Sequence, residues 1–190
     1  MLGKMILLDL IEKSDDVMSR KLHIGGQVKV DGWEVFNAID ADYVDHVGNA
    51  KDLSRFADET FAEIYASHVL EHFDYKDELV HVLKEWYRVL QKGGKLFISV
   101  PDIDTIFSLF LMKNKFDVSA RFAMMRNIFG GHVNEYDYHI TGLNEEFLRI
   151  YLGQAGFSSY KKVDRFGIFP DTSDYKIAGI LASLNIIATK

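Results

Sequence analysis

The chain has 190 residues, of which 48% are hydrophobic and 26% charged, as expected for one soluble globular domain. The absence of cysteine excludes disulfides, thiolate metal sites and cysteine nucleophiles, and it is consistent with a cytoplasmic location. The net charge of −6 at pH 7 argues against nonspecific nucleic-acid binding, which depends on positive charge.

Residues 1–18 are expected to form a short helix or an irregular lead-in. Asp9 and Glu12 interrupt their apolar stretch, and no cleavage-site pattern follows, so we predict no signal peptide. The apolar run at 103–112 is shorter than the roughly 18 residues that span a bilayer. We therefore expect neither a membrane nor a nucleic acid as partner.

Short β-rich runs alternate with stretches of helical period, which predicts an α/β fold. The helical signal is clearest over 75–91, and Gly93-Gly94 is expected to end this helix. Two further helices are expected within 103–129, and Asn144 is expected to cap another. The expected strands are 21–24, 33–39, 43–47, 61–66, 95–100, 159–163 and 183–189.

This alternation predicts a mostly parallel sheet with helices on both faces, within a single domain over 1–190. Residues 103–142 are expected to form a helical insertion, or lid, after the fifth strand. Ligands of such sheets bind at the carboxyl ends of the strands. The loops that follow the strands are therefore the candidate site.

Gly25 and Gly26 follow the first strand, and two adjacent glycines allow the backbone to approach a ligand closely. An ordinary tight turn explains the same pair.

The string from His68 to His72 reads His-x-x-Glu-His and follows the fourth strand. It matches an inverted zinc-peptidase pattern, for which Glu145 or Glu146 could supply a third ligand. That pattern requires a helix, whereas a strand end is expected here. A zinc hydrolase therefore stays a remote alternative, beside a purely structural role for His72.

Residues 130–142 place His132, Tyr136, Tyr138 and His139 in one loop. Such a loop could form a substrate wall, or it could pack its aromatic rings on the core. We predict that it covers the mouth of the pocket and selects the acceptor.

The stretch from Phe61 to Asp102 combines features that occur together in a known family. It contains Ser67-His68-Val69-Leu70-Glu71-His72, then Glu85-Trp86-Tyr87-Arg88-Val89-Leu90, then Gly93-Gly94 before a strand. Together with Gly25-Gly26 and Asn49-Ala50, it resembles the class I S-adenosylmethionine (SAM)-dependent methyltransferases, in particular their small type-11-like group.

The resemblance implies a Rossmann-like seven-stranded sheet of order 3-2-1-4-5-7-6, with the last strand antiparallel and SAM across the ends of strands one to four. The glycine-rich motif of this chain departs from the family pattern at two positions. His23 occupies the place of an acid and Gln27 that of a glycine, so the motif is degenerate. The ribose-binding acid is either replaced by Asn37 or displaced to Asp40, and Asn49 stands for an adenine-contacting Asp.

The function expected from this resemblance is SAM-dependent methyl transfer to a small-molecule or sugar-containing acceptor. The alternative is a non-catalytic binding protein with the same fold and an altered cofactor site. No metal ligands are assigned, and the sequence does not define the oligomeric state. The cofactor contacts implied are Gly25, Gly26, Asn37, Asn49, Ala50, Ser67 and His68, and the candidate bases are His68, His72, His132 and His139.

Overall fold

The computed structural model describes residues 19–190. The lead-in expected at 1–18, and with it the question of a signal peptide, lies outside the described residues.

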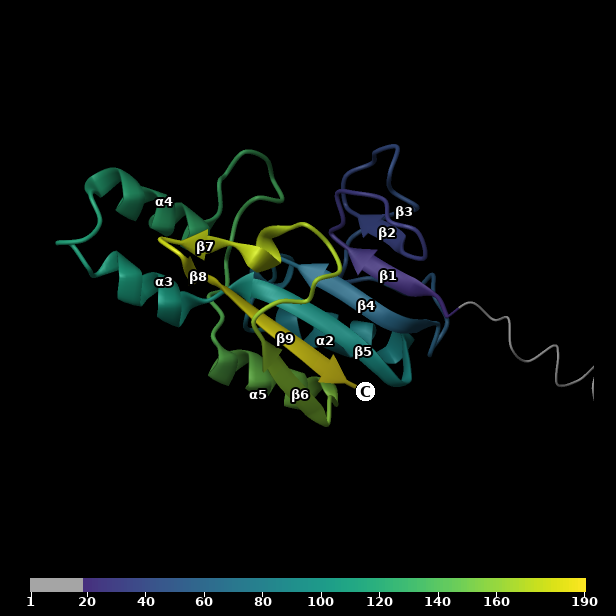
Figure 1. Ribbon diagram of the computed structural model, residues 1–190. Coiled ribbons are helices and arrows are strands. Elements are labelled where there is room, and N and C mark those ends of the chain that lie inside the picture. Colours follow the sequence, from purple (N-terminus) through teal and green to yellow (C-terminus); the bar gives the residue numbers. More distant parts are fainter. Residues whose placement is uncertain (1–18) are drawn as a thin grey trace, which may run out of the picture.

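A seven-stranded sheet forms the centre of the molecule (Figure 1), with strand order β3-β2-β1-β4-β5-β9-β6. Strand β9 runs antiparallel to its neighbours β5 and β6, whereas β3, β2, β1, β4 and β5 pair in parallel. Because β9 is the last strand of the sheet in the chain, the predicted order and its antiparallel last strand are confirmed. The strands are β1 (Lys21–Ile24), β2 (Glu34–Asn37), β3 (His46–Val47), β4 (Phe61–Ser67), β5 (Leu90–Pro101), β6 (Ser159–Val163) and β9 (Ser183–Thr189).

Within residues 19–190 the sequence predicts four α-helices, and all four are present. They are α2 (Glu78–Val89), α3 (Ile103–Phe110), α4 (Val118–Phe129) and α5 (Glu145–Ala155). Asn144 caps α5 as predicted, because its side chain accepts a hydrogen bond from Phe147 N. The short hairpin of β7 (Lys176–Ile177) and β8 (Ile180–Leu181), and the 3-10 turns η1 (Leu70–His72) and η2 (Thr172–Asp174), were not expected.

The prediction that Gly93-Gly94 ends helix α2 is wrong. The helix ends at Val89, and Leu90 is already extended because it pairs with Phe61 of β4. Gly93 adopts its left-handed conformation, with φ of 73°, within β5, where the register with β4 shifts between Leu90 and Lys95.

The two faces of the sheet are covered differently. Helices α2 and α5 pack on one face, where apolar residues of both helices join those of β1, β4, β5 and β9 in one core cluster. Aromatic side chains cover the opposite face, among them Trp33, Tyr65, Phe97 and Phe169. The links 25–33 and 38–45 are shorter than the dozen or so residues of a usual helical crossover, so loops and their aromatic rings replace helices there.

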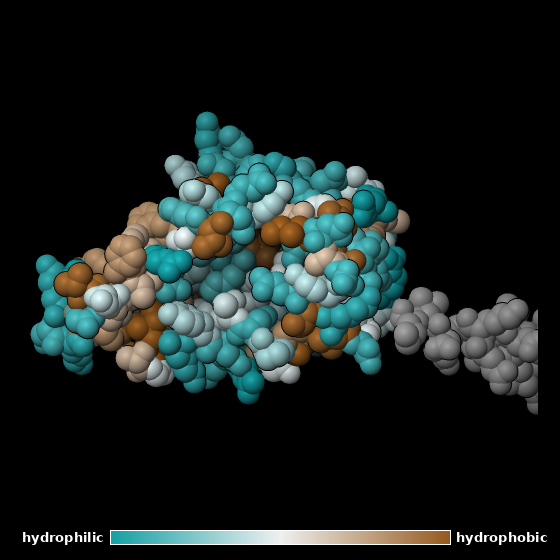
Figure 2. All heavy atoms as spheres, turned by 90° about the horizontal axis from the view of Figure 1, so that it is seen from above, coloured by the Kyte–Doolittle hydropathy of each residue, from teal (hydrophilic) through white to brown (hydrophobic). Residues whose placement is uncertain are grey.

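Residues 103–142 leave the sheet at the end of β5 and return beside the same point, because Ile103 N donates a hydrogen bond to Leu143 O. Helices α3 and α4 pack on each other beyond the sheet around Ile106, Leu109 and Met124. Apolar side chains are also exposed at this end of the molecule, on the left of Figure 2. The most exposed of them are Leu111, Val118 and Phe122. No helix among residues 19–190 is both long and apolar enough to span a membrane.

Candidate functional site

A cavity of about 710 Å³ opens at the carboxyl ends of the parallel strands. Ile24 at the end of β1, Asn37 at the end of β2 and Ser67 at the end of β4 lie in one wall. Residues 133–140, from the loop after α4, also line the cavity. The cavity therefore lies at the edge of the sheet where α/β folds bind ligands.

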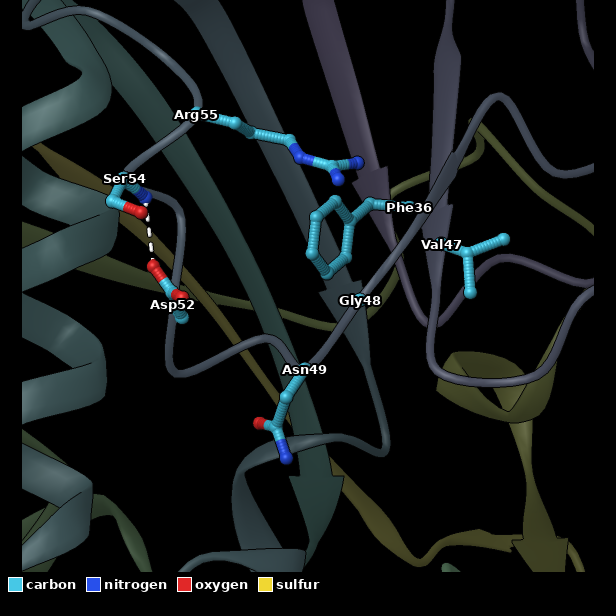
Figure 3. Close-up of a pocket in the computed structure, with 7 residues that line it drawn as sticks. All are labelled: Phe36, Val47, Gly48, Asn49, Asp52, Ser54 and Arg55. Atoms are coloured by element: carbon cyan, nitrogen blue, oxygen red, sulfur yellow. Dashed lines mark hydrogen bonds between the residues drawn. The ribbon is translucent and has the colours of Figure 1, made fainter.

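A smaller cavity of about 340 Å³ adjoins the first and shares Phe36, Gly48 and Asn49 with it. Figure 3 shows these residues with Arg55 and with Asp52, whose carboxylate accepts a hydrogen bond from Ser54 N. A side chain at Gly48 would start 2.8 Å from the Phe36 ring. Glycine at this position therefore lets the loop pass against that ring, between the two cavities.

The turn after β1 places its two glycines differently. Gly25 lines the larger cavity, has a left-handed φ of 75°, and donates a hydrogen bond from its N–H to Phe36 O. Gly26 is not part of the wall, and a Cβ there would lie 2.8 Å from the His23 ring. Gly26 is thus required for packing inside the turn, whereas Gly25 faces the cavity.

His23 does not line the cavity. Its ring is buried on the aromatic face of the sheet, with its centroid 4.0 Å from that of Phe169, and its Nδ1 has no hydrogen-bond partner within residues 19–190. Burial lowers the pKa of His23 to about 4, against the opposing charge of Asp171. A neutral ring that faces away from the cavity cannot replace an acid that would face a ligand there.

Asn37 ends β2 in the cavity wall, whereas Asp40 is exposed outside it. The Asn37 side chain donates a hydrogen bond to Gly26 O and accepts one from Ile39 N. Asn37 therefore fastens the turn after β1 to the end of β2, which leaves one amide hydrogen and one oxygen lone pair for a ligand.

Asn49 and Ala50 line the cavity from the loop after β3. The side-chain oxygen Oδ1 of Asn49 accepts a hydrogen bond from Lys51 N, and the buried Trp86 donates from Nε1 to Ala50 O at 2.9 Å. Helix α2 therefore holds this part of the wall in place.

Arg88, from the same helix, ties down the continuation of that loop. Its guanidinium donates hydrogen bonds to Leu53 O and Phe56 O and forms ion pairs with Glu85 and Asp58. These carboxylates raise the pKa of Arg88 further above its usual value, so it stays charged. Trp86 and Arg88, which lie in the family-like stretch of the sequence, thus position the cavity wall without lining it.

Ser67 ends β4 and His68 follows it, and both line the cavity. His68 has a positive φ of 55°, and its Nε2 lies 3.1 Å from Ser183 Oγ. Its Nδ1 lies 3.3 Å from a carboxylate oxygen of Glu71. The backbone therefore turns at His68 and directs the ring toward buried groups.

His72 and His139 meet at the side of the cavity, with ring centroids 4.8 Å apart. The Nδ1 atom of His72 lies 3.0 Å from Tyr138 O, and that of His139 lies 3.0 Å from Asn127 O. Burial is the main cause that lowers the pKa of His139, and His72 lowers it further. The negative charge of Glu71 raises this pKa, but by less than burial lowers it. Glu71 O also accepts hydrogen bonds from Ile140 N and Thr141 N, which fastens the loop to η1.

The zinc-peptidase pattern is not realised as such. His68 lies in a turn and His72 in the 3-10 turn η1, so the two rings do not share one face of an α-helix. The third group beside Glu71 and His72 is His139, whereas Glu145 begins helix α5 and pairs with Lys162.

His132 lies outside the cavity wall. Its ring stacks on Tyr138 at 4.1 Å, and its Nε2 is 2.8 Å from Phe129 O, so it stabilises the loop internally. Tyr136 and Tyr138 are half-exposed and line the cavity. Sequence patterns gave no indication of Tyr43 and Thr172, which also line it.

The fold is that of solved SAM-dependent methyltransferases. Residues 7–98 match the model of a family described as "Methyltransferase domain". A search of curated proteins gave no match. The family match, together with the sheet order, confirms the resemblance seen in the sequence.

Solved structures similar to this chain agree on the fold. A SAM-dependent methyltransferase from Archaeoglobus fulgidus has 18% identity and a TM-score of 0.57, over 100% of this chain and 93% of its own. A SAM-dependent methyltransferase from Methanosarcina mazei has 18% identity and a TM-score of 0.55, and the match covers 95% of this chain and 96% of that one. One from Thermotoga maritima, described as a possible histamine N-methyltransferase, has 17% identity and a TM-score of 0.55. That match covers 96% of this chain and 87% of the other.

Proposed function

We propose that this protein is a SAM-dependent methyltransferase that acts on a small-molecule or sugar-containing acceptor. The observation that carries the proposal is the cavity at the carboxyl ends of β1, β2 and β4. Its wall contains Gly25, Asn37, Asn49, Ala50, Ser67 and His68, all of which the family resemblance relates to the cofactor.

The residues present fit such a cofactor. A cavity of about 710 Å³ is within the usual range for sites of cofactors and small ligands. No side chain projects from Gly25 or Gly48, and Ala50 is small. The Asn49 side chain is exposed at the boundary of the two cavities, where it can hydrogen-bond an adenine. Bound SAM would supply a sulfonium methyl group that is already activated for transfer.

The contribution of the chain is then mainly alignment and exclusion of water. Residues 133–140 line the cavity together with the strand ends, which supports an acceptor position between this loop and the cofactor. In this proposal residues 103–142 act as the insertion that shapes the acceptor site.

The candidate bases differ in what the structure allows. His68, His72 and His139 line the cavity, whereas His132 does not. A proton acceptor needs a nitrogen lone pair. His72 and His139 keep one on Nε2, because each donates from Nδ1 to a backbone carbonyl. They are therefore the preferred candidates for removing a proton from a hydroxyl or ammonium acceptor.

Isothermal titration calorimetry with SAM and with S-adenosylhomocysteine tests the proposal. We expect saturable binding to the wild type and none to Ala38→Trp, because Ala38 lines the cavity and an indole would fill it. Ala123→Trp, at an exposed position on α4, is the matched control and should bind like the wild type. A folded wild type that binds neither compound would favour the non-catalytic alternative.

A further inference from the structure

Glu71 is a buried carboxylate with no hydrogen bond to either of its oxygens among the described residues. Its side chain is 2% exposed. A carboxylate removed from water and left without donors is strongly destabilised, so it requires a proton or a cation. In the described part of the chain, only the imidazoles of His68 and His139 come within ion-pair distance of it.

The two histidines next to it are oriented as metal ligands. A backbone carbonyl can only accept a hydrogen bond, so His72 and His139 each carry their proton on Nδ1. The Nε2 atom of each neutral ring then holds a free lone pair. Donation of the other ring N–H to a backbone carbonyl is the arrangement that fixes metal-bound histidines.

We propose that Glu71, His72 and His139 bind a divalent transition-metal ion in the wall of the cavity. One ligand atom from each lies within 4.8 Å of the others, and Glu71 Oε1 is 3.9 Å from His139 Nε2. Zinc bonds of about 2.1 Å in tetrahedral geometry would place these atoms about 3.4 Å apart. Closure by roughly 1 Å, through small side-chain rotations, therefore completes the site.

The types of the three ligand atoms indicate which metal ion would bind, and their position in the cavity wall indicates what that ion would do. Two imidazoles and one carboxylate suit zinc, and also iron(II), better than magnesium or calcium. His72 and His139 line the cavity, so the remaining coordination positions face it. His68, whose Nδ1 lies 3.3 Å from Glu71 Oε1, would help to hold the carboxylate in place.

With both Nε2 lone pairs bound to the ion, His72 and His139 no longer act as bases. The ion itself then activates the acceptor, because it lowers the pKa of a hydroxyl that coordinates to it. The acceptor class that fits is therefore an alcohol or a phenol. This choice of acceptor rests on the proposed function, whereas metal binding itself does not.

The test is titration of chelator-treated protein, free of any polyhistidine tag, with Zn²⁺ by calorimetry and with Co²⁺ by visible absorption. We expect one ion per chain, a Co²⁺ spectrum of low coordination number, and a rise in melting temperature with Zn²⁺. His72→Ala and His139→Ala should weaken binding at least tenfold. His81→Ala, an exposed histidine on α2, should change nothing.

His139→Gln preserves much of the side-chain volume, and its melting curve shows whether lost metal binding reflects lost folding. Absence of stoichiometric binding to folded wild type, or unchanged binding in folded His72→Ala and His139→Ala, would overturn the proposal and leave Glu71 in an ion pair with the histidines. SAM binding without metal binding would refute this inference alone, and metal binding without SAM binding would refute the proposed function alone.

Discussion

Protonation of His23 should destabilise the fold as the pH falls from 7 to 5. The ring is 4% exposed, and burial lowers its pKa from 6.5 to about 4. The unfolded chain therefore binds this proton more readily than the folded one, so stability is lost as the pH falls below 6.5. Linkage with these two values gives a loss of about 2 kcal/mol between pH 7 and pH 5.

Other groups also titrate in this range, so the measurement is a comparison with His23→Phe. This variant keeps an aromatic ring beside Phe169 and Tyr65 but cannot be protonated. Urea unfolding followed by circular dichroism at pH 7 and pH 5 gives the two free energies of unfolding. We expect the wild type to lose about 2 kcal/mol more than the variant. Equal losses in both proteins would show that His23 is not neutralised by burial.

Three further substitutions test how the cavity wall is held. Trp86→Phe removes the donor to Ala50 O, so it should lower the free energy of unfolding by about 1 to 2 kcal/mol and weaken SAM binding in calorimetry. If stability and SAM binding are both unchanged, α2 does not hold the cavity wall through this bond. Arg88→Lys cannot donate to both Leu53 O and Phe56 O, so the free energy of unfolding measured in urea should fall by about 2 kcal/mol. A variant as stable as the wild type would contradict the stabilising role of these hydrogen bonds. Asn49→Asp keeps the acceptor for Lys51 N and should bind SAM roughly fivefold more tightly in calorimetry, because a carboxylate is a stronger acceptor for the adenine amino group. Weaker binding would contradict a contact between residue 49 and the adenine.

Much of the fold could be predicted because its elements carry local signals. Strands β1, β6 and β9 begin and end where the sequence indicated, and most apolar residues of β9 are buried as that pattern predicts. Strand β3 is shorter than expected, since Val44 N donates to Ala41 O in a turn. The loops over the aromatic face could not be predicted, because their order depends on distant partners such as Asp171, which accepts a hydrogen bond from Tyr65.

The candidate site was partly predictable for the same reason. Residues at strand ends, such as Gly25 and Ser67, meet at one edge once the sheet is parallel. Side-chain direction was not predictable: His23 faces the aromatic core instead of the cavity. The meeting of His139 with Glu71 depends on how residues 103–142 fold back, for which the sequence has no local signal.

A crystal structure of the protein soaked with saturating S-adenosylhomocysteine tests the central claim most directly. The account predicts density for the ligand across the ends of β1 and β2, with its adenine beside Asn49 and its sulfur directed toward residues 133–140. Density at another place, or an empty cavity in a well-ordered crystal at saturating ligand, would contradict the assignment of this cavity to a methyltransferase cofactor.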